Sequence, residues 1–592
     1  MDLDRLMAVR EGSAGSSPDT PRLILGPMLR YVSGTEATIW VEIDRPGEVK
    51  VLGRTARTFS VGDHHYALVC LTELQPGGRY EYDVCLDGHV IWPESGSQVP
   101  LSVIHTVPAE GPVRVRFGSC LVTAPHEPPY TLPWSEHPKG LGIDALRTLA
   151  LELETAMPDE WPHVLLLMGD QVYADEVSPT TRAFIRSRRD VTVPPYEGVA
   201  DFEEYTHAYL EAWRDPAVRW LLSTVSTAMI FDDHEVQDDW NISESWVDEI
   251  RREPWWNERI VSALMSYWVY QHIGNLGPDE LAADDVYQEV LATEGDASEV
   301  LRRFAFRADR QNETCRWSYT RDLGMTRLVV IDSRASRLLL NGRREMVDDV
   351  EWAWLEEVTA GGCDHLLMAT SLPYLLFPSV HALQAWNEAV CDGAWGPLAA
   401  RVGERIRRAV DLEHWAAFGE SFDRLARLIR SVGAGERGRA PASIIILSGD
   451  VHYTSLARVR FRRHSRVTSR VYQVVCSPLR HPLRRRERRA HRLSAMRPGE
   501  WIGRLLARSA GVERPIIRWK TLMGPTFDNN LGTLELRGRE ARLRIERAVD
   551  GEGASGLELT EERVLSDERV AGRRRRRRRL GRWLARRAGS RG

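Results

Sequence analysis

The sequence predicts a layered α/β domain preceded by a small all-β domain. A run of apolar residues, 164–168, ends in glycine and is followed at once by Asp170 and Tyr173, as in a buried parallel strand with polar groups at its carboxyl end. Helical stretches with apolar residues at three- and four-residue spacing lie between such strands, which favours sheets covered by helices. Residues 22–108 instead show short period-two alternation broken by Gly and Pro turns, which is typical of an antiparallel sandwich.

Chain length and composition indicate a soluble protein of several domains. A chain of 592 residues is too long for one core, and 43% hydrophobic with 28% charged residues is ordinary for globular proteins. Residues 573–592 hold eleven arginines and no acid, so the rest of the chain carries 68 basic against 84 acidic residues. No signal peptide and no apolar run of about twenty residues is visible. We therefore expect no integral membrane segment and a cytoplasmic protein, with peripheral attachment to a membrane as an alternative.

The composition shifts along the chain predict four regions. Residues 1–20 read as a disordered arm, and 21–108 as an immunoglobulin-like or fibronectin-like β-sandwich domain. The catalytic domain is predicted over 112–548, with a basic insertion at 480–520. An arginine-rich tail, 549–592, is expected to be disordered.

Three further predicted strands end in residues that can bind metals. They lead into Gly118-Ser119-Cys120, into Asp232-Asp233-His234-Glu235 and into Ser448-Gly449-Asp450-Val451-His452. The carboxyl ends of the strands in an open α/β sheet are where ligands bind. Thiol, carboxylate, phenol and imidazole groups at four such ends predict a site for two metal ions.

These motifs, in this order, resemble the alkaline phosphatase D (PhoD-like) family of metallophosphoesterases. The resemblance covers roughly residues 21–548 and includes the Gly169-Asp170-x-x-Tyr173 motif. It implies a calcineurin-like metallophosphoesterase domain behind the β domain. It also implies metal-dependent hydrolysis of phosphate esters, as a phosphodiesterase, an alkaline phosphomonoesterase or both.

Asp170, Tyr173 and Cys120 are candidates to bind the first metal. Asp170 and Tyr173 stand three residues apart just past a strand, so both can turn onto one ion. A phenolate is a hard, charge-donating ligand, which makes iron(III) the first candidate. A Cys120 thiolate suits iron as well. The alternatives are that Tyr173 is a buried aromatic residue with a hydrogen bond and that Cys120 is a small buried hydrophobe.

The resemblance assigns roles to the remaining site residues. It implies that Asp233 and Asp450 bind the second metal, that His452 binds the iron, and that Asp170 bridges the two ions. It implies that His234 protonates the leaving alkoxide, a role that suits the pKa of histidine. Asp238 and Asp239 stand at positions where the family has an Asn-rich pair. We therefore expect Asp238 to help bind a hard divalent ion as the second metal. Calcium is the first candidate, with zinc and manganese as alternatives.

Two arginines and one missing ligand complete the predicted site. Arg334 and Arg337 follow another β run and are candidates to clamp phosphate oxygens, with surface salt bridges as the alternative. The superfamily has one more metal-binding histidine, but His365 lies at the wrong end of its strand. The predicted mechanism is in-line attack by water activated between two cations about 3.5 Å apart.

The basic segments suggest other functions. The chain could be a non-catalytic protein that binds membranes or nucleic acid, or a nuclease or phospholipase that uses these segments to select its substrate. Seven arginines at 573–579 could bind an anionic membrane surface or nucleic acid. Residues 501–508 look like an amphipathic helix that acts as a lid, as a contact for acidic partners or as a plain solvated helix.

Overall fold

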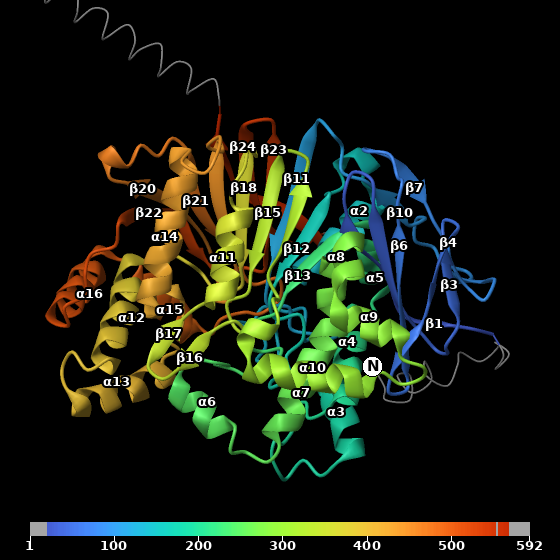
Figure 1. Cartoon of the computed structure of the whole chain (residues 1–592), viewed down its shortest axis with the longest axis horizontal. Coiled ribbons are helices and arrows are strands. Elements are labelled where there is room, and N and C mark those ends of the chain that lie inside the picture. Colours follow the sequence, from blue (N-terminus) through green and yellow to red (C-terminus); the bar gives the residue numbers. More distant parts are fainter. Residues whose placement is uncertain (1–19, 552–554, 568–592) are drawn as a thin grey trace, which may run out of the picture.

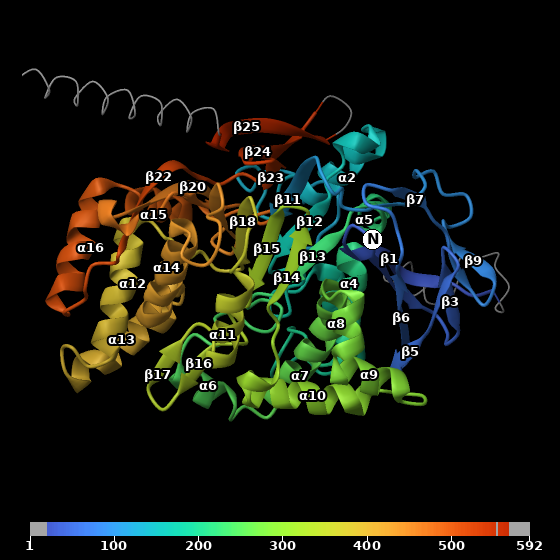
Figure 2. The same cartoon turned by 45° about the horizontal axis from the view of Figure 1, so that its top comes forward.

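The computed structural model describes residues 20–551 and 555–567 of the chain, arranged as Figure 1 shows. Except for Thr20, the arm predicted over 1–20 lies outside the described residues, and so does the arginine run 573–579. The small amino-terminal sheets occupy one end of the molecule, and helices α12, α13 and α16 occupy the other (Figures 1 and 2).

The amino-terminal region is built only of strands. Period-two runs such as Thr38-Ile39-Trp40-Val41 pair in the antiparallel manner, with Met28 opposite Trp40 and Ile39 opposite Val69. One four-stranded sheet contains, in spatial order, β1 (Leu23–Val32), β2 (Ala37–Ile43), β6 (His64–Leu71) and β5 (Phe59–Val61). A second contains β4 (Arg54–Arg57), β3 (Glu48–Val51), β8 (Val84–Leu86) and β9 (His89–Trp92), and β10 (Val103–His105) pairs with β7 (Arg79–Glu81). The assignment to an immunoglobulin-like or fibronectin-like class stays a prediction.

Two larger mixed sheets form the rest of the molecule. The six-stranded sheet has the order β13 (Thr227–Ile230), β12 (Val164–Met168), β11 (Pro112–Gly118), β23 (Asn530–Arg537), β24 (Glu540–Asp550) and β25 (Ser555–Ser566). The seven-stranded sheet has the order β14 (Tyr319–Leu323), β15 (Thr326–Ile331), β18 (His365–Thr370), β19 (Ser443–Ser448), β21 (Arg470–Val475), β20 (Thr454–Phe461) and β22 (Ile517–Thr526). A hairpin joins β16 (Leu338–Leu340) to β17 (Arg343–Glu345). Strands β11, β12 and β13 run parallel to one another, and so do β15, β18, β19 and β21.

Helices fill the connections between these strands. They are α2 (Ala145–Thr155), α3 (Pro179–Arg188), α4 (Phe202–Trp213), α5 (Pro216–Thr224), α6 (Glu244–Ile250), α7 (Trp256–Tyr267), α8 (Pro278–Ala283), α9 (Asp285–Ala292), α10 (Ser298–Arg310), α11 (Asp349–Val358), α12 (Pro378–Cys391), α13 (Pro397–Ala409), α14 (Gly419–Ala434), α15 (Arg485–Ser494) and α16 (Arg497–Ser509). The apolar spacing over 202–222 suggests one helix, but the structure has two. Asp215 caps the backbone N–H groups at the start of α5, and Pro216 begins that helix.

The central strands bury alternate residues on opposite faces. In β15, Leu328 and Val330 join a core that also contains the six-stranded sheet, whereas Val329 and Ile331 join a core with α11 and α14. Strands β18 and β19 follow the same alternation. One face of the seven-stranded sheet therefore meets the other sheet and the opposite face meets helices. An α/β fold is confirmed, and its calcineurin-like assignment stays a prediction.

The carboxyl-terminal boundary of the predicted catalytic domain is wrong. Disorder was expected over 549–592, but β25 pairs with β24 along its length, with Leu543 opposite Arg563 and Asp550 opposite Ser555. The alternation of this segment is masked by its many charged residues, because one face of this edge strand is exposed. The six-stranded sheet therefore continues to Ser566.

The all-β region is attached to the α/β region that follows it by polar contacts. His64 of β6 lies 2.7 Å from Glu42 through Nδ1 and 2.8 Å from Glu203 of α4 through Nε2. The Tyr82 hydroxyl donates to the Ser223 carbonyl oxygen at 2.6 Å. The contacts with Glu203 and Ser223 cross the boundary between the regions and hold them together.

Candidate metal centre

The candidate site lies where parallel strands of the two large sheets end. Cys120 follows β11, Asp170 follows β12, and Asp450 and His452 follow β19. All four have left-handed backbone angles, with φ of 59°, 54°, 66° and 49°. Such angles are uncommon outside glycine and cluster at functional sites. Here they turn the chain sharply at the ends of the strands.

Gly449 allows the ends of the two sheets to approach each other. A Cβ atom at this position would lie 2.1 Å from Ser119 Oγ and 3.0 Å from the Met168 carbonyl oxygen. No larger residue fits without moving β11 or β12. The close approach brings ligands from one sheet next to ligands from the other.

The first group of potential ligands contains Cys120, Asp170 and His452. One ligand atom from each lies within 4.8 Å of the others. The Tyr173 hydroxyl joins them, 3.3 Å from Asp170 Oδ2. Burial, and then Asp170 and Asp450, raises the pKa of the Cys120 thiol well above its usual range. Burial lowers the pKa of His452 well below its usual range, which keeps its imidazole neutral and free to bind a metal.

The second group contains Asp170, Asp232 and Asp233, all of them buried. Each of the three has one buried carboxylate oxygen without a hydrogen-bond partner, namely Asp170 Oδ1, Asp232 Oδ2 and Asp233 Oδ1. Burial raises the pKa of all three carboxyl groups. Of these oxygens, Asp233 Oδ1 still has the Arg334 guanidinium 3.2 Å away, whereas Asp170 Oδ1 and Asp232 Oδ2 have no such partner among the described residues. Three buried carboxylates of this kind fit a hard cation, which would offset the cost of burying their charges.

Sequence reasoning missed Asp232 and a residue that supports it, Glu235. The Glu235 carboxylate accepts hydrogen bonds from the backbone N–H groups of Asp170 at 2.9 Å, Gln171 at 2.8 Å and Asp232 at 2.9 Å. It thus ties the loop after β12 to the loop after β13. The Asp232-Asp233-His234-Glu235 motif contains both residues, but nothing in the sequence shows which way each side chain points.

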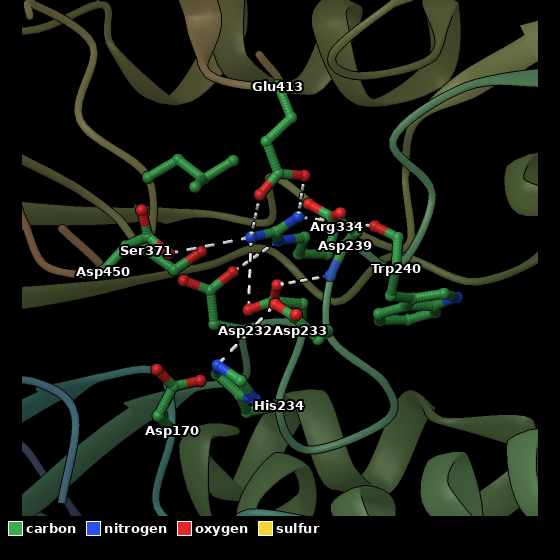
Figure 3. Close-up of polar contacts among 12 residues, drawn as sticks. Asp170, Asp232, Asp233, His234, Asp239, Trp240, Arg334, Ser371, Glu413 and Asp450 are labelled. Atoms are coloured by element: carbon green, nitrogen blue, oxygen red, sulfur yellow. Dashed lines mark hydrogen bonds and ion pairs between the residues drawn. The ribbon is translucent and has the colours of Figure 1, made fainter. Parts of the chain in front are cut away.

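Arg334 is surrounded by carboxylates, as Figure 3 shows. Its guanidinium pairs with Asp232 and Glu413, lies 3.2 Å from Asp233, and lies 3.7 Å from Asp450. Arg337 donates to the Ser333 and Asn241 carbonyl oxygens at 2.8 Å and lies 3.2 Å from Glu413. Both arginine side chains are buried, so the alternative of surface salt bridges is wrong. Their guanidinium groups are engaged by the carboxylates of Asp232 and Glu413 and by backbone carbonyl oxygens.

His234 is oriented by Asp175, which the sequence did not single out. Nδ1 of His234 lies 2.9 Å from Asp175 Oδ1, and Nε2 lies 3.9 Å from Asp238. Burial alone would lower the pKa of His234, but the carboxylates of Asp175 and Asp233 raise it well above its usual value. Asp238, which we predicted to bind the second metal, has an exposed side chain and belongs to neither group of ligands.

Three histidines differ in their relation to the site. His365 lies at the start of β18 and contacts Ser443 at 2.7 Å, so it is far along the strand from the ligands. His414 Nε2 lies instead 3.1 Å from Asp450 Oδ2, and Gln384 contacts its other ring nitrogen at 2.9 Å. The His481 ring stacks on His452 with a centroid distance of 4.0 Å. Neither His414 nor His481 is part of a recognisable local motif, so sequence reasoning missed both.

Asp450 lies beside the two groups rather than within them. Its carboxylate faces His414 and Arg334, while its backbone carbonyl oxygen lies 3.7 Å from Cys120 Sγ. The sequence therefore placed the residue correctly at the site. Its predicted role as a ligand of the second metal stays a prediction.

Comparison with known proteins gives two family matches. Residues 152–304 match the family described as PhoD-like phosphatase. This segment is identified as part of a PhoD-like phosphatase domain. Residues 20–104 match a domain of unknown function (DUF7800), which coincides with the all-β region. The PhoD-like match spans the loops after β12 and β13, and therefore Asp170, Tyr173, Asp233 and His234.

A comparison of folds agrees with the PhoD-like match. The solved structure titled "Structure of PhoD" aligns over 93% of this chain and 94% of that chain, with a TM-score of 0.55 and 11% sequence identity. An amylomaltase from Corynebacterium glutamicum aligns with a TM-score of 0.11 and 12% identity, which carries no argument. A search among curated protein sequences found no match. The predicted enzyme class, a hydrolase acting on phosphoric esters, is confirmed for the PhoD-like domain.

Proposed function

We propose that this PhoD-like protein hydrolyses phosphate esters with two metal ions bound side by side. The observation that carries the proposal is that Asp170 belongs to both groups of ligands. A carboxylate with two oxygens can bridge two cations. Phosphodiesterase and alkaline phosphomonoesterase activity both agree with such a centre.

The two groups differ in chemistry, which suggests two different metals. Cys120, Tyr173 and His452 with Asp170 supply sulfur, phenol and imidazole, a set that suits iron(III). Asp232 and Asp233 with Asp170 supply only carboxylate oxygens, a set that suits a hard divalent ion. Calcium remains the first candidate, with zinc and manganese as alternatives. When bound, such ions lower the pKa of water and attract the phosphate oxygens.

The protein groups around the ligands would orient the substrate and move a proton. Asp175 accepts a hydrogen bond from Nδ1 of His234, which fixes the ring and leaves Nε2 free to protonate the leaving alkoxide. Arg334 offsets the charges of Asp232 and Asp233 and holds their carboxylates in place. A direct role of Arg334 and Arg337 in binding phosphate stays a prediction that their contacts do not support.

The test is to remove the shared ligand. Asp170→Asn should lower the content of both metals, measured by elemental analysis, and abolish hydrolysis of a chromogenic phosphodiester and of the matching monoester. Asp322→Asn, at an exposed ion pair with Arg327, is the matched control and should keep both. A metal-loaded, fully active Asp170→Asn variant would refute the proposal.

The alternatives in which basic segments define the function receive less support. The arginine run 573–579 lies outside the described residues, so its binding to membranes or nucleic acid stays a prediction. So do a cytoplasmic location and a nuclease or phospholipase specificity. Among the described helices, none combines the length and apolar character needed to cross a bilayer.

A further inference from the structure

Helix α16 packs on the protein through its smallest residues. Gly499, Gly503 and Ala507 face α12, and a Cβ atom on Gly503 would lie 2.9 Å from the Ser379 carbonyl oxygen and 3.2 Å from Ala382 Cβ. The Trp395 indole N–H donates to the Ser509 carbonyl oxygen at 3.1 Å and ties down the end of the helix. The helix is thus held closely against α12.

The large apolar residues of α16 point the other way. Trp501, Ile502 and Leu505 are 67%, 54% and 43% exposed. At about 100° per residue, Trp501 and Leu505 lie on the side opposite Gly503, and Ile502 lies on the flank of the helix. Leu493 near the end of α15 and Met496 just before α16 are 63% and 54% exposed. A helix on an ordinary protein surface buries its large apolar residues, so this arrangement is reversed.

Arginines border this apolar face. Five exposed ones are Arg485, Arg486 and Arg489 on α15 and Arg504 and Arg508 on α16. Arg492 of α15 is also exposed, but its guanidinium lies over the Phe527 ring. Within the described part of the chain, no carboxylate lies within 4.0 Å of these residues apart from Glu500, which pairs with Arg504. We name the five arginines, together with Leu493, Met496, Trp501, Ile502 and Leu505, the α15–α16 surface.

The α15–α16 surface begins beside the metal centre. The His491 ring of α15 lies 5.1 Å from the ring of Tyr453, which directly follows His452. From there α16 extends to the end of the molecule that lies away from the all-β region (Figures 1 and 2). A partner bound to this surface would therefore lie next to the phosphoesterase site.

We propose that the α15–α16 surface docks on an anionic lipid bilayer, with α16 lying in the plane of the interface. Apolar side chains flanked by exposed arginines, of which only Arg504 has an acidic partner among the described residues, match acyl chains below anionic headgroups. A second copy of the chain would bring the same arginines face to face, which is repulsive. A nucleic acid would satisfy the arginines but would leave Ile502 and Leu505 without apolar partners.

The test measures binding of the full chain to vesicles of phosphatidylcholine with and without phosphatidylglycerol, by flotation. Wild-type protein should bind only the vesicles that contain phosphatidylglycerol. The triple variant Trp501→Ser, Ile502→Ser, Leu505→Ser should bind about tenfold more weakly or worse, because it loses the apolar part of the contact. Arg485→Gln with Arg486→Gln and Arg489→Gln should weaken binding at low salt but little at high salt.

Two controls keep the outcome interpretable. Val90, Val193 and Leu340 are similarly exposed apolar residues elsewhere, and their triple serine variant should bind as wild type does. Circular dichroism and gel filtration verify that each variant is folded and report its oligomeric state, independently of any enzymatic activity. The proposal is overturned if the Trp501 triple variant binds as tightly as wild type, since the tail would then carry the binding. It is equally overturned if wild-type protein is a dimer and the Trp501 triple variant is a monomer, since the surface would then be an interface between two copies of the chain.

Discussion

The Glu235 carboxylate holds the backbone of Asp170, with a distance of 2.9 Å between Glu235 Oε2 and the Asp170 nitrogen. The same oxygen accepts a hydrogen bond from the Asp232 N–H at 2.9 Å. Glu235 does not itself belong to either group of potential ligands, but it ties together Asp170 and Asp232, which do. Groups of this kind tune metal affinity through geometry.

Glu235→Gln should weaken metal binding without removing a ligand. An amide N–H₂ group in place of one carboxylate oxygen would face a backbone N–H donor and repel it, so the two loops would separate. We expect a loss of about 10- to 100-fold in metal affinity or activity, measured by titration with metal and by kcat and KM. Glu249→Gln, at an exposed pair with Arg408, should change neither. Unaltered metal affinity in Glu235→Gln would show that the two loops are held by other contacts.

Tyr173→Phe should remove the visible absorption band of the protein without removing bound iron. If iron(III) occupies the first group, the wild-type protein has a visible band from charge transfer between tyrosinate and iron. The variant keeps Cys120, Asp170 and His452, so we expect it to retain iron but lose this band. Absorption spectra and elemental analysis of the same sample test this. Tyr196→Phe, at an exposed tyrosine, is the control and should keep the band. A band that persists in Tyr173→Phe would show that Tyr173 is not the ligand.

Arg334→Met should destabilise the protein more than it alters substrate binding. The change leaves Asp232, Asp233 and Glu413 buried without their counter-charge, which typically costs about 3–5 kcal/mol. Denaturant unfolding measures the loss. Arg430→Met, at an exposed pair with Glu436, should cost about 1 kcal/mol or less. A large rise in KM with unchanged stability would instead support the role of Arg334 as a phosphate clamp.

The contact of His64 with two glutamates should make stability depend on pH. Burial would lower the pKa of His64, but Glu203 and Glu42 raise it from 6.5 to about 9. The stabilisation is therefore complete below pH 6.5 and is lost as the pH rises through about 9. It amounts to about 3 kcal/mol at most. The difference in unfolding free energy between wild type and His64→Gln should shrink over this pH range, and a constant difference would contradict the shift.

The sequence predicted the site best where a local pattern coincides with a strand end. Cys120, Asp170, Tyr173 and His452 follow apolar runs, and the structure brings them together. The sequence could not show that Arg334 is buried, because its partner Glu413 lies 79 residues away along the chain. His414 and His481 were missed for the same reason, since their neighbours belong to other elements. Asp238 was expected as a ligand because it stands where the resembling family has Asn-rich residues, but its side chain is exposed and belongs to neither group of potential ligands.

The left-handed backbone of Cys120, Asp170, Asp450 and His452 bears on how the protein assembles. An unfolded chain seldom visits these conformations, and here they occur at contacts that need both large sheets in place. Cys120 and Asp170 come from one sheet, whereas His452 comes from the other. A nascent chain thus presents cations with only scattered fragments of the pocket until the sheets have docked. We expect metal uptake to be one of the last events of maturation, following global folding rather than guiding it.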